Sequence, residues 1–131
     1  MNYLLDTHTF LWYYSGAQHL GQPAKLALEH PANTFFVSIV SIWEIAIKNS
    51  LGKLDLDAPL SVFLQDVVQK GFNLMPIDLV HILQSTMLPF HHRDPFDRLL
   101  IGQALAENLI LVSKDPTFDA YCESSGLKLI W

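Results

Sequence analysis

Four acidic side chains in this 131-residue sequence stand where they could act together on one ion. They are Asp6, Glu44, Asp97 and Asp115. Carboxylates a few ångströms apart repel one another and raise their pKa values unless a cation neutralises them. Hard divalent cations that prefer oxygen ligands, above all Mg²⁺ and Mn²⁺, suit such a set. The four acids therefore predict a divalent-metal site, in which Asp6 and Asp97 are the expected direct ligands.

Each acid also has a simpler explanation, because each stands near an expected helix start. Ser41 and Glu44 have the spacing of a capping box. Asp115 precedes a proline and would make a good N-cap, while Asp97 falls in a first helical turn, where a carboxylate favours the helix dipole. Asp94, also before a proline, we expect to be an N-cap rather than a ligand. Caps explain the acids one at a time, and a metal accounts for the set.

The elements that must position these acids alternate between strands and helices. Strands are expected at 3–5, 35–37, 74–77, 109–112 and 128–130, with helices at 10–14, 23–30, 39–51, 59–70, 78–87, 94–108 and after 115. This alternation predicts an α/β fold with a central, mostly parallel sheet. The carboxyl ends of parallel strands share one edge with the following helix N-termini, where ligands bind. Asp6, Glu44 and Asp115 would lie at that edge, and we expect Asp97 near it.

The segment from residue 39 has the strongest helical pattern. Its apolar stripe has helical spacing and consists of Ile39, Ile42, Trp43, Ala46 and Ile47. Val40 and Ile45 make the segment apolar almost all round, which predicts deep burial.

Composition limits the class of protein. Half of the residues are apolar and 16% are charged, which is typical of a globular chain, here expected as one domain over residues 1–131. No apolar run approaches the roughly 20 residues of a membrane span. The single cysteine, Cys122, excludes an internal disulfide, and the N-terminal residues do not resemble a secretory signal, so we expect a cytoplasmic protein. A net charge of −5 argues against binding nucleic acid mainly through a basic surface.

Several stretches together resemble PIN-domain ribonucleases, specifically the VapC-type toxins of bacterial type II toxin–antitoxin systems. The matching stretches are Leu4-Leu5-Asp6-Thr7-His8, residues 38–48, residues 52–54, His92-Arg93-Asp94-Pro95-Phe96-Asp97-Arg98 with its continuation to 101, and residues 111–115. They span nearly the whole chain in the family's order. Gly102 departs from the pattern, since the family usually has alanine there.

The resemblance implies a single PIN-like domain with a parallel five-stranded sheet flanked by helices. It also implies that the four acids are the catalytic residues and metal ligands of an endoribonuclease that uses Mg²⁺ or Mn²⁺ to activate a water. Cleavage would leave a 5′-phosphate and a 3′-hydroxyl. The expected partners are an RNA substrate, a small antitoxin that covers the site, and a second copy of the chain in a homodimer.

Other polar residues lie beside the acids. Thr7, Ser38 and Ser113 could orient an acid or a water by hydrogen bonding, although a local cap is an equal alternative for each. Arg98 could bind a substrate phosphate or form a structural ion pair. His8, His91 and His92 lack a visible orienting partner, so we do not expect histidine catalysis. The aromatic run 10–14 is more typical of a core or an interface than of a base-stacking platform.

Two other functions compete. A phosphatase of the haloacid-dehalogenase type also begins with an aspartate after its first strand, but it needs a second aspartate two residues on, where this chain has His8. A catalytically inactive PIN-like module that binds RNA or protein is the second alternative. The presence of all four acids argues against lost activity.

Overall fold

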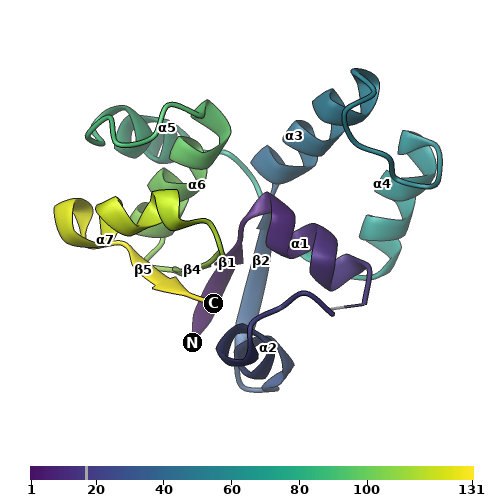
Figure 1. Cartoon of the computed structure of the whole chain (residues 1–131), viewed down its shortest axis with the longest axis horizontal. Helices are drawn as coiled ribbons and strands as arrows, with labels where there is room; N and C mark the ends of the chain where they lie inside the picture. Colours follow the sequence, from purple (N-terminus) through teal and green to yellow (C-terminus); the bar gives the residue numbers. More distant parts are fainter. Residues whose placement is uncertain (17) are drawn as a thin grey trace.

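Five strands form a single sheet in the computed structural model, which describes residues 1–16 and 18–131 (Figure 1). They are β1 (Asn2–Leu5), β2 (Thr34–Ser38), β3 (Asn73–Met75), β4 (Ile110–Val112) and β5 (Lys128–Ile130). The strand order is β3-β2-β1-β4-β5, and each neighbouring pair is parallel. The prediction of a five-stranded, largely parallel sheet is confirmed. The expected strand at 74–77 ends earlier, at Met75, because the next residue is Pro76, which has no N–H to donate.

Helices cover both faces of this sheet. They are α1 (Thr7–Tyr14), α2 (Gln22–Glu29), α3 (Ile39–Ser50), α4 (Leu60–Gln69), α5 (Leu79–Thr86), α6 (Pro95–Ala106) and α7 (Asp119–Ser125). The helix expected after 115 begins as a 3₁₀ turn, η1 (Pro116–Phe118), before α7. No helix of the described residues has the length and apolar character needed to cross a membrane.

Alternation along the strands divides the buried side chains into two cores. Leu4 packs with Leu100 of α6 and Tyr121 of α7 on one face. Leu5, one residue later, packs with Phe10 of α1 and with α4 on the other. Successive side chains of a strand point to opposite faces, so a buried strand must be apolar on both. Burial on both faces explains why the sequence of β1 is a continuous apolar run.

Helix α3 departs from the sequence prediction. Its buried side chains are Val40, Ser41, Glu44 and Ile45, whereas Trp43 is 56% exposed. The prediction of deep burial for the whole segment was wrong, because Val40 and Ile45 are buried but Ile39 and Trp43 of the apolar stripe are exposed. The helix is turned so that two polar side chains, Ser41 and Glu44, face inward, where the Thr7 hydroxyl donates to Glu44 and shares a hydrogen bond with the Ser41 hydroxyl.

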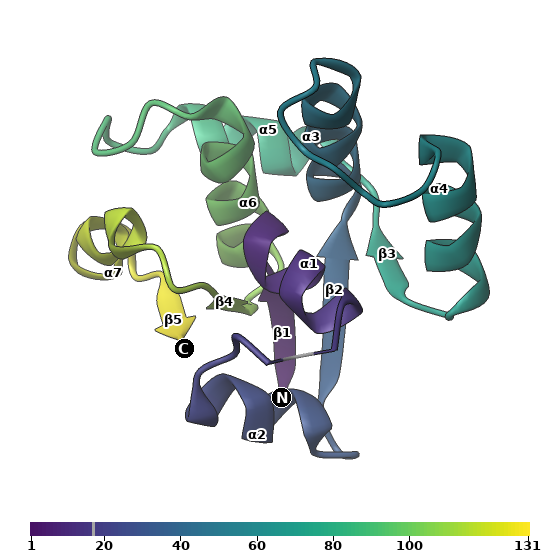
Figure 2. The same ribbon diagram turned by 45° about the vertical axis from the view of Figure 1, so that its right-hand side comes forward.

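The register of the sheet sets up one polar edge. Leu5 of β1 lies opposite Val37 of β2 and Val112 of β4. The next residue of each strand therefore reaches the same edge, and these residues are Asp6, Ser38 and Ser113. Figure 2 shows α3 and α6 beyond the arrowheads of β1 and β2, with α2 at the opposite end beside the N-terminus. The edge is thus the place where the acids can meet.

Candidate functional site

Asp6 is held at the end of β1 by its role as the N-cap of α1. One carboxylate oxygen accepts a hydrogen bond from the Thr9 amide at 2.8 Å, and the other accepts one from the Ser113 hydroxyl at 2.5 Å. The side chain is buried. Burial raises the pKa of Asp6 above its ordinary value, and these two hydrogen bonds oppose the rise. Removing water disfavours the charged carboxylate, so a cation here would be stabilising.

Ser113 joins Asp6 to the loop that carries Asp115. Its hydroxyl donates to Asp6 and accepts from the amide of Asp115 at 3.0 Å. Asp115 in turn caps η1, where its carboxylate accepts from the Thr117 amide at 3.0 Å. Ser113 thus hydrogen-bonds to the side chain of one predicted acid and the backbone of another, and Asp115 makes the contact of an N-cap.

Asp97 lies in the first turn of α6 and faces the same edge. Burial raises its pKa to about 7, with further contributions from the negative charges of Asp94 and Glu44, while His92 opposes the rise. Helices α3 and α6 pack against each other, and the negative charge of Glu44 on α3 adds to the raised pKa of Asp97 on α6. Asp94 itself is the N-cap of α6, accepting from the Phe96 amide at 2.9 Å, as predicted.

His92 is the partner of Asp97 that the sequence did not reveal. Its Nδ1 accepts from the amide of Asp94 at 3.3 Å, which assigns the proton to Nε2, and Nε2 donates to Asp97 Oδ2 at 2.8 Å. Ligand atoms of His92, Asp97 and Asp115 all lie within 4.8 Å of one another. No spacing rule predicts this contact, because His92 belongs to the loop before α6 and only the path of that loop aims its ring.

Glu44 is buried on α3 and does not form the capping box that its spacing suggested. It accepts a hydrogen bond from the Thr7 hydroxyl at 2.7 Å and pairs with Lys48, one turn later, at 2.5 Å. Ser38, and not Ser41, caps the helix by accepting from the Val40 amide at 3.0 Å. Thr7 therefore hydrogen-bonds to a predicted acid, whereas Ser38 makes a local capping contact, and an orienting role in a site stays a prediction for both.

Arg98 is engaged within the fold. Its buried guanidinium donates hydrogen bonds of 2.9 to 3.4 Å to the carbonyls of Ser85, Leu88, Pro89 and His92 and to the hydroxyl of Tyr121. These contacts fix the loop that presents His92. A phosphate contact of Arg98 stays a prediction that this geometry does not favour.

The donor set fits a divalent cation. Two acids, Asp6 and Asp97, have raised pKa values because they are buried, and Asp97 and Asp115 bring ligand atoms together with a histidine. Carboxylate oxygens suit Mg²⁺ or Mn²⁺, whereas both ring nitrogens of His92 are engaged in hydrogen bonds. Asp6 is linked to Asp115 through Ser113, and Asp97 and Asp115 have ligand atoms close together. Glu44 is linked to Thr7 and Lys48, and its place in a shared metal site stays a prediction.

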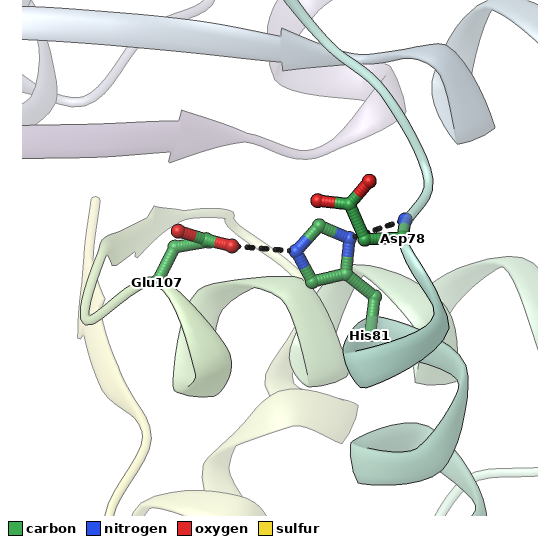
Figure 3. Close-up of side chains that lie close together, drawn as sticks. All are labelled: Asp78, His81 and Glu107. Carbon is green, nitrogen blue, oxygen red and sulfur yellow. Dashed lines mark hydrogen bonds and ion pairs between the residues drawn. The ribbon is translucent and has the colours of Figure 1, made fainter.

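A second acidic group lies elsewhere, where α5 begins (Figure 3). His81 is buried, and its Nδ1 accepts from the amide of Asp78 at 3.0 Å, so Nε2 carries the proton and donates to Glu107 at 2.8 Å. Both ring nitrogens are engaged, and neither offers a lone pair to an ion. This group is a helix cap that ties α5 to the end of α6.

Comparison with known proteins gives the same fold and a family. A model of the PIN domain family matches residues 3–124. Ribonuclease VapC22 of Mycobacterium tuberculosis is 27% identical over 115 residues, which cover 86% of this chain and 85% of that protein. VapBC2 from Rickettsia felis, bound to a promoter DNA fragment, aligns with a TM-score of 0.71 at 18% identity over 100% of this chain and 99% of that one. VapBC-5 from Mycobacterium tuberculosis aligns with a TM-score of 0.67 at 18% identity, over 98% and 97%.

Proposed function

The chain belongs to the PIN domain family, and on that premise we propose that it is a divalent-cation-dependent endoribonuclease, the toxin of a toxin–antitoxin pair. The family match covers most of the chain, and the relative named above is a ribonuclease. The structure of VapBC-5 is described as a member of the VapBC family of toxin-antitoxin systems. These likenesses support the class of activity.

One observation carries the proposal for this chain: acids from separate segments lie toward the carboxyl edge of the sheet, and ligand atoms of Asp97 and Asp115 lie within 4.8 Å of each other there. Asp97 has a pKa near 7 there because it is buried beside other carboxylates. A fold that keeps such an acid buried gains stability when a cation binds beside it. Capping explains Asp94 and Asp115, but it does not explain the burial of Glu44 and Asp97.

We assign Asp6, Glu44, Asp97 and Asp115 as the residues that would hold Mg²⁺ or Mn²⁺. When bound, such an ion lowers the pKa of a water and offsets the charge on the scissile phosphate. The chain's own residues orient the acids: Thr7 donates to Glu44, Ser113 to Asp6 and His92 to Asp97. These contacts hold each carboxylate in one orientation.

The remaining partners follow from the same proposal. We propose RNA as substrate, an antitoxin protein as inhibitor and a homodimer as the assembled form. Exposed apolar side chains on one side of α5 support an interface between copies, and they include Leu79 at 85% and Leu83 at 59% exposure. The cytoplasm stays the expected location, on the basis of the single cysteine.

The experiment is a cleavage assay on a mixture of single-stranded RNAs, with Mg²⁺, Mn²⁺ or EDTA. We expect cleavage with either ion and none with EDTA. Asp97→Asn should lower the rate by at least about 100-fold, because the variant removes a charge that neighbours the proposed ion.

The matched control is Asp57→Asn, the same chemical change at an exposed loop residue with φ of 57°, a conformation that asparagine tolerates. This variant should cleave as the wild type does. If Asp97→Asn and Asp57→Asn cleave equally well, the acids are structural. If the wild type binds RNA without cutting it, the inactive binding module is the better description.

A further inference from the structure

A pocket opens directly beside the proposed metal site. It has a volume of about 400 Å³ and is lined by Asp6, His8, Trp12, Lys114, Asp115 and Pro116. Two of the proposed metal ligands thus share a wall with an aromatic ring and a cationic side chain. The sequence favoured a core or interface role for the aromatic run that contains Trp12. The structure instead places this ring at the mouth of the site.

The Trp12 ring is braced by other rings. Trp131 meets it edge-on with ring centroids 5.6 Å apart, and His19 and His8 lie at 5.7 and 5.9 Å. Such contacts limit the orientations open to the indole. A ring that is held before a ligand arrives loses less entropy when the ligand stacks on it.

The negative net charge of the protein limits how much phosphate contacts can contribute to its affinity for RNA. The net charge is −5 with only eight lysines and arginines. Lys48 pairs with Glu44, Lys70 pairs with Asp66, and Arg98 is buried against carbonyls. Phosphate contacts from lysine and arginine usually dominate the affinity of proteins for nucleic acids. Three of the eight cationic side chains are thus engaged within the protein, and stacking of bases on aromatic rings is a further contribution to affinity that tolerates any sequence.

We propose that this pocket binds an unpaired base of the RNA next to the phosphate that is cleaved. Trp12 stacks on the base, and Lys114 contacts the adjoining phosphate. Bases in a duplex are already paired and stacked, so the base that enters the pocket must be unpaired. This inference rests on the proposed function and adds a base-binding pocket to it.

The first test measures binding of a labelled oligouridine by fluorescence anisotropy. Ca²⁺ replaces Mg²⁺ as an oxygen-liganded cation, and a gel verifies that the RNA stays intact. Trp12→Ala should bind about 5- to 100-fold more weakly, and Trp12→Phe should keep most of the affinity because it keeps a ring. Trp43→Ala is the control, since Trp43 is an exposed tryptophan of α3 outside the pocket lining. Unchanged binding by Trp12→Ala would overturn the proposal.

A second test changes the RNA instead of the protein. It therefore tests the base pocket even if Trp12→Ala is too unstable to measure. The wild type should bind an oligomer with abasic riboses as weakly as Trp12→Ala binds oligouridine. Equal affinity of the wild type for both oligomers would refute a base pocket. Suppose that the wild type cleaves RNA and Asp97→Asn does not, but that neither Trp12→Ala nor the abasic oligomer weakens binding. In that case only this inference fails. If the wild type neither binds nor cleaves RNA, the proposed function fails with it.

Discussion

At the scale of single residues, the raised pKa of Asp97 makes the stability of the metal-free protein depend on pH. Its pKa is about 7 in the folded chain, against 3.8 as the ordinary value. The folded state therefore holds a proton that the unfolded state has already lost between these two pH values. The contribution of Asp97 to stability therefore falls as pH rises from about 4 to about 7, and it is lost above that range.

Asp97→Asn should remove this loss. In EDTA at pH 8 we expect the variant to unfold at a higher temperature than the wild type. Its free energy of unfolding should be larger by on the order of 1–3 kcal/mol, and this difference should shrink toward pH 4. Mg²⁺ should raise the melting temperature of the wild type alone. Thermal melts across pH provide the measurement. A variant that is less stable than the wild type at pH 8 in EDTA would contradict the raised pKa.

His92 should act on the metal through Asp97. Replacing it with alanine removes the Nε2–H donor that fixes Oδ2, and losing such an orienting contact typically costs about 10- to 100-fold in metal affinity. His92→Gln retains an N–H donor and should recover part of the loss. Titration of Mn²⁺ into each variant measures this directly.

The control for that comparison is His91→Ala, which removes the exposed neighbour that packs edge-on against Tyr121. It should bind Mn²⁺ as the wild type does. Equal affinity of His92→Ala and His91→Ala would mean that Asp97 needs no orientation from the loop.

The sequence located the acids better than it located their supports. Asp6, Glu44, Asp97 and Asp115 were identified by where they fall relative to strand ends and helix starts, which depends only on local pattern. The contacts of His92 and Arg98 depend on how the loop from residue 88 to 94 returns toward α6 and α7. That path is fixed by long-range packing, including the bond from the His92 amide to the Tyr121 hydroxyl at 3.0 Å, so no local pattern encodes it.

At the scale of elements, the packing of α5 against α6 explains the glycine that departs from the family pattern. A Cβ added at Gly102 would lie 2.7 Å from the His81 carbonyl oxygen and 2.9 Å from the Ser85 amide nitrogen. Both are backbone atoms of α5, so the two helices would have to separate. The close approach of these helices accounts for glycine at this position, which the sequence alone left as an oddity.

Gly102→Ala should therefore destabilise the fold. Alanine improves helix propensity by up to about 1 kcal/mol, but overpacking costs about 1–3 kcal/mol, so a net loss is expected. Urea unfolding measures it, with Glu123→Ala on the exposed side of α7 as a control that should stay within about 0.5 kcal/mol of the wild type. A variant as stable as the wild type would show that α5 can shift without cost.

Helix α3 shows where a periodicity rule fails. The strongest apolar stripe of the chain does not mark the buried face, because the inward positions are used by Ser41 and Glu44 at the polar edge. Local pattern predicted the helix and its start near Ile39. It could not predict the rotation, which depends on the hydrogen bonds from Thr7.

At the scale of the whole molecule, the exposed apolar residues of α5 and the loop after it predict self-association. Leu79, Leu83 and Met87 follow one another at helical spacing, and Phe90 continues the patch at 82% exposure. Burying such a patch against a second copy removes apolar surface from water without pairing like charges.

We expect the wild type to sediment at twice the 14.9 kDa of one chain. Leu83→Lys should shift it toward the monomer, because the dimer would bury two unpaired ammonium groups. Leu51→Lys, at an exposed leucine just after α3, should leave the dimer intact. Sedimentation at 14.9 kDa for the wild type, or equal behaviour of the two variants, would remove α5 as the interface.

The gathering of distant acids around one divalent ion is tested most directly by calorimetric titration of Mn²⁺ into the RNA-free protein. We expect saturable binding by the wild type and by Asp57→Asn, with binding by Asp97→Asn weakened by at least about tenfold. A wild type that takes up no Mn²⁺, or an Asp97→Asn protein that binds it as tightly as the wild type, would contradict a metal site at this edge of the sheet.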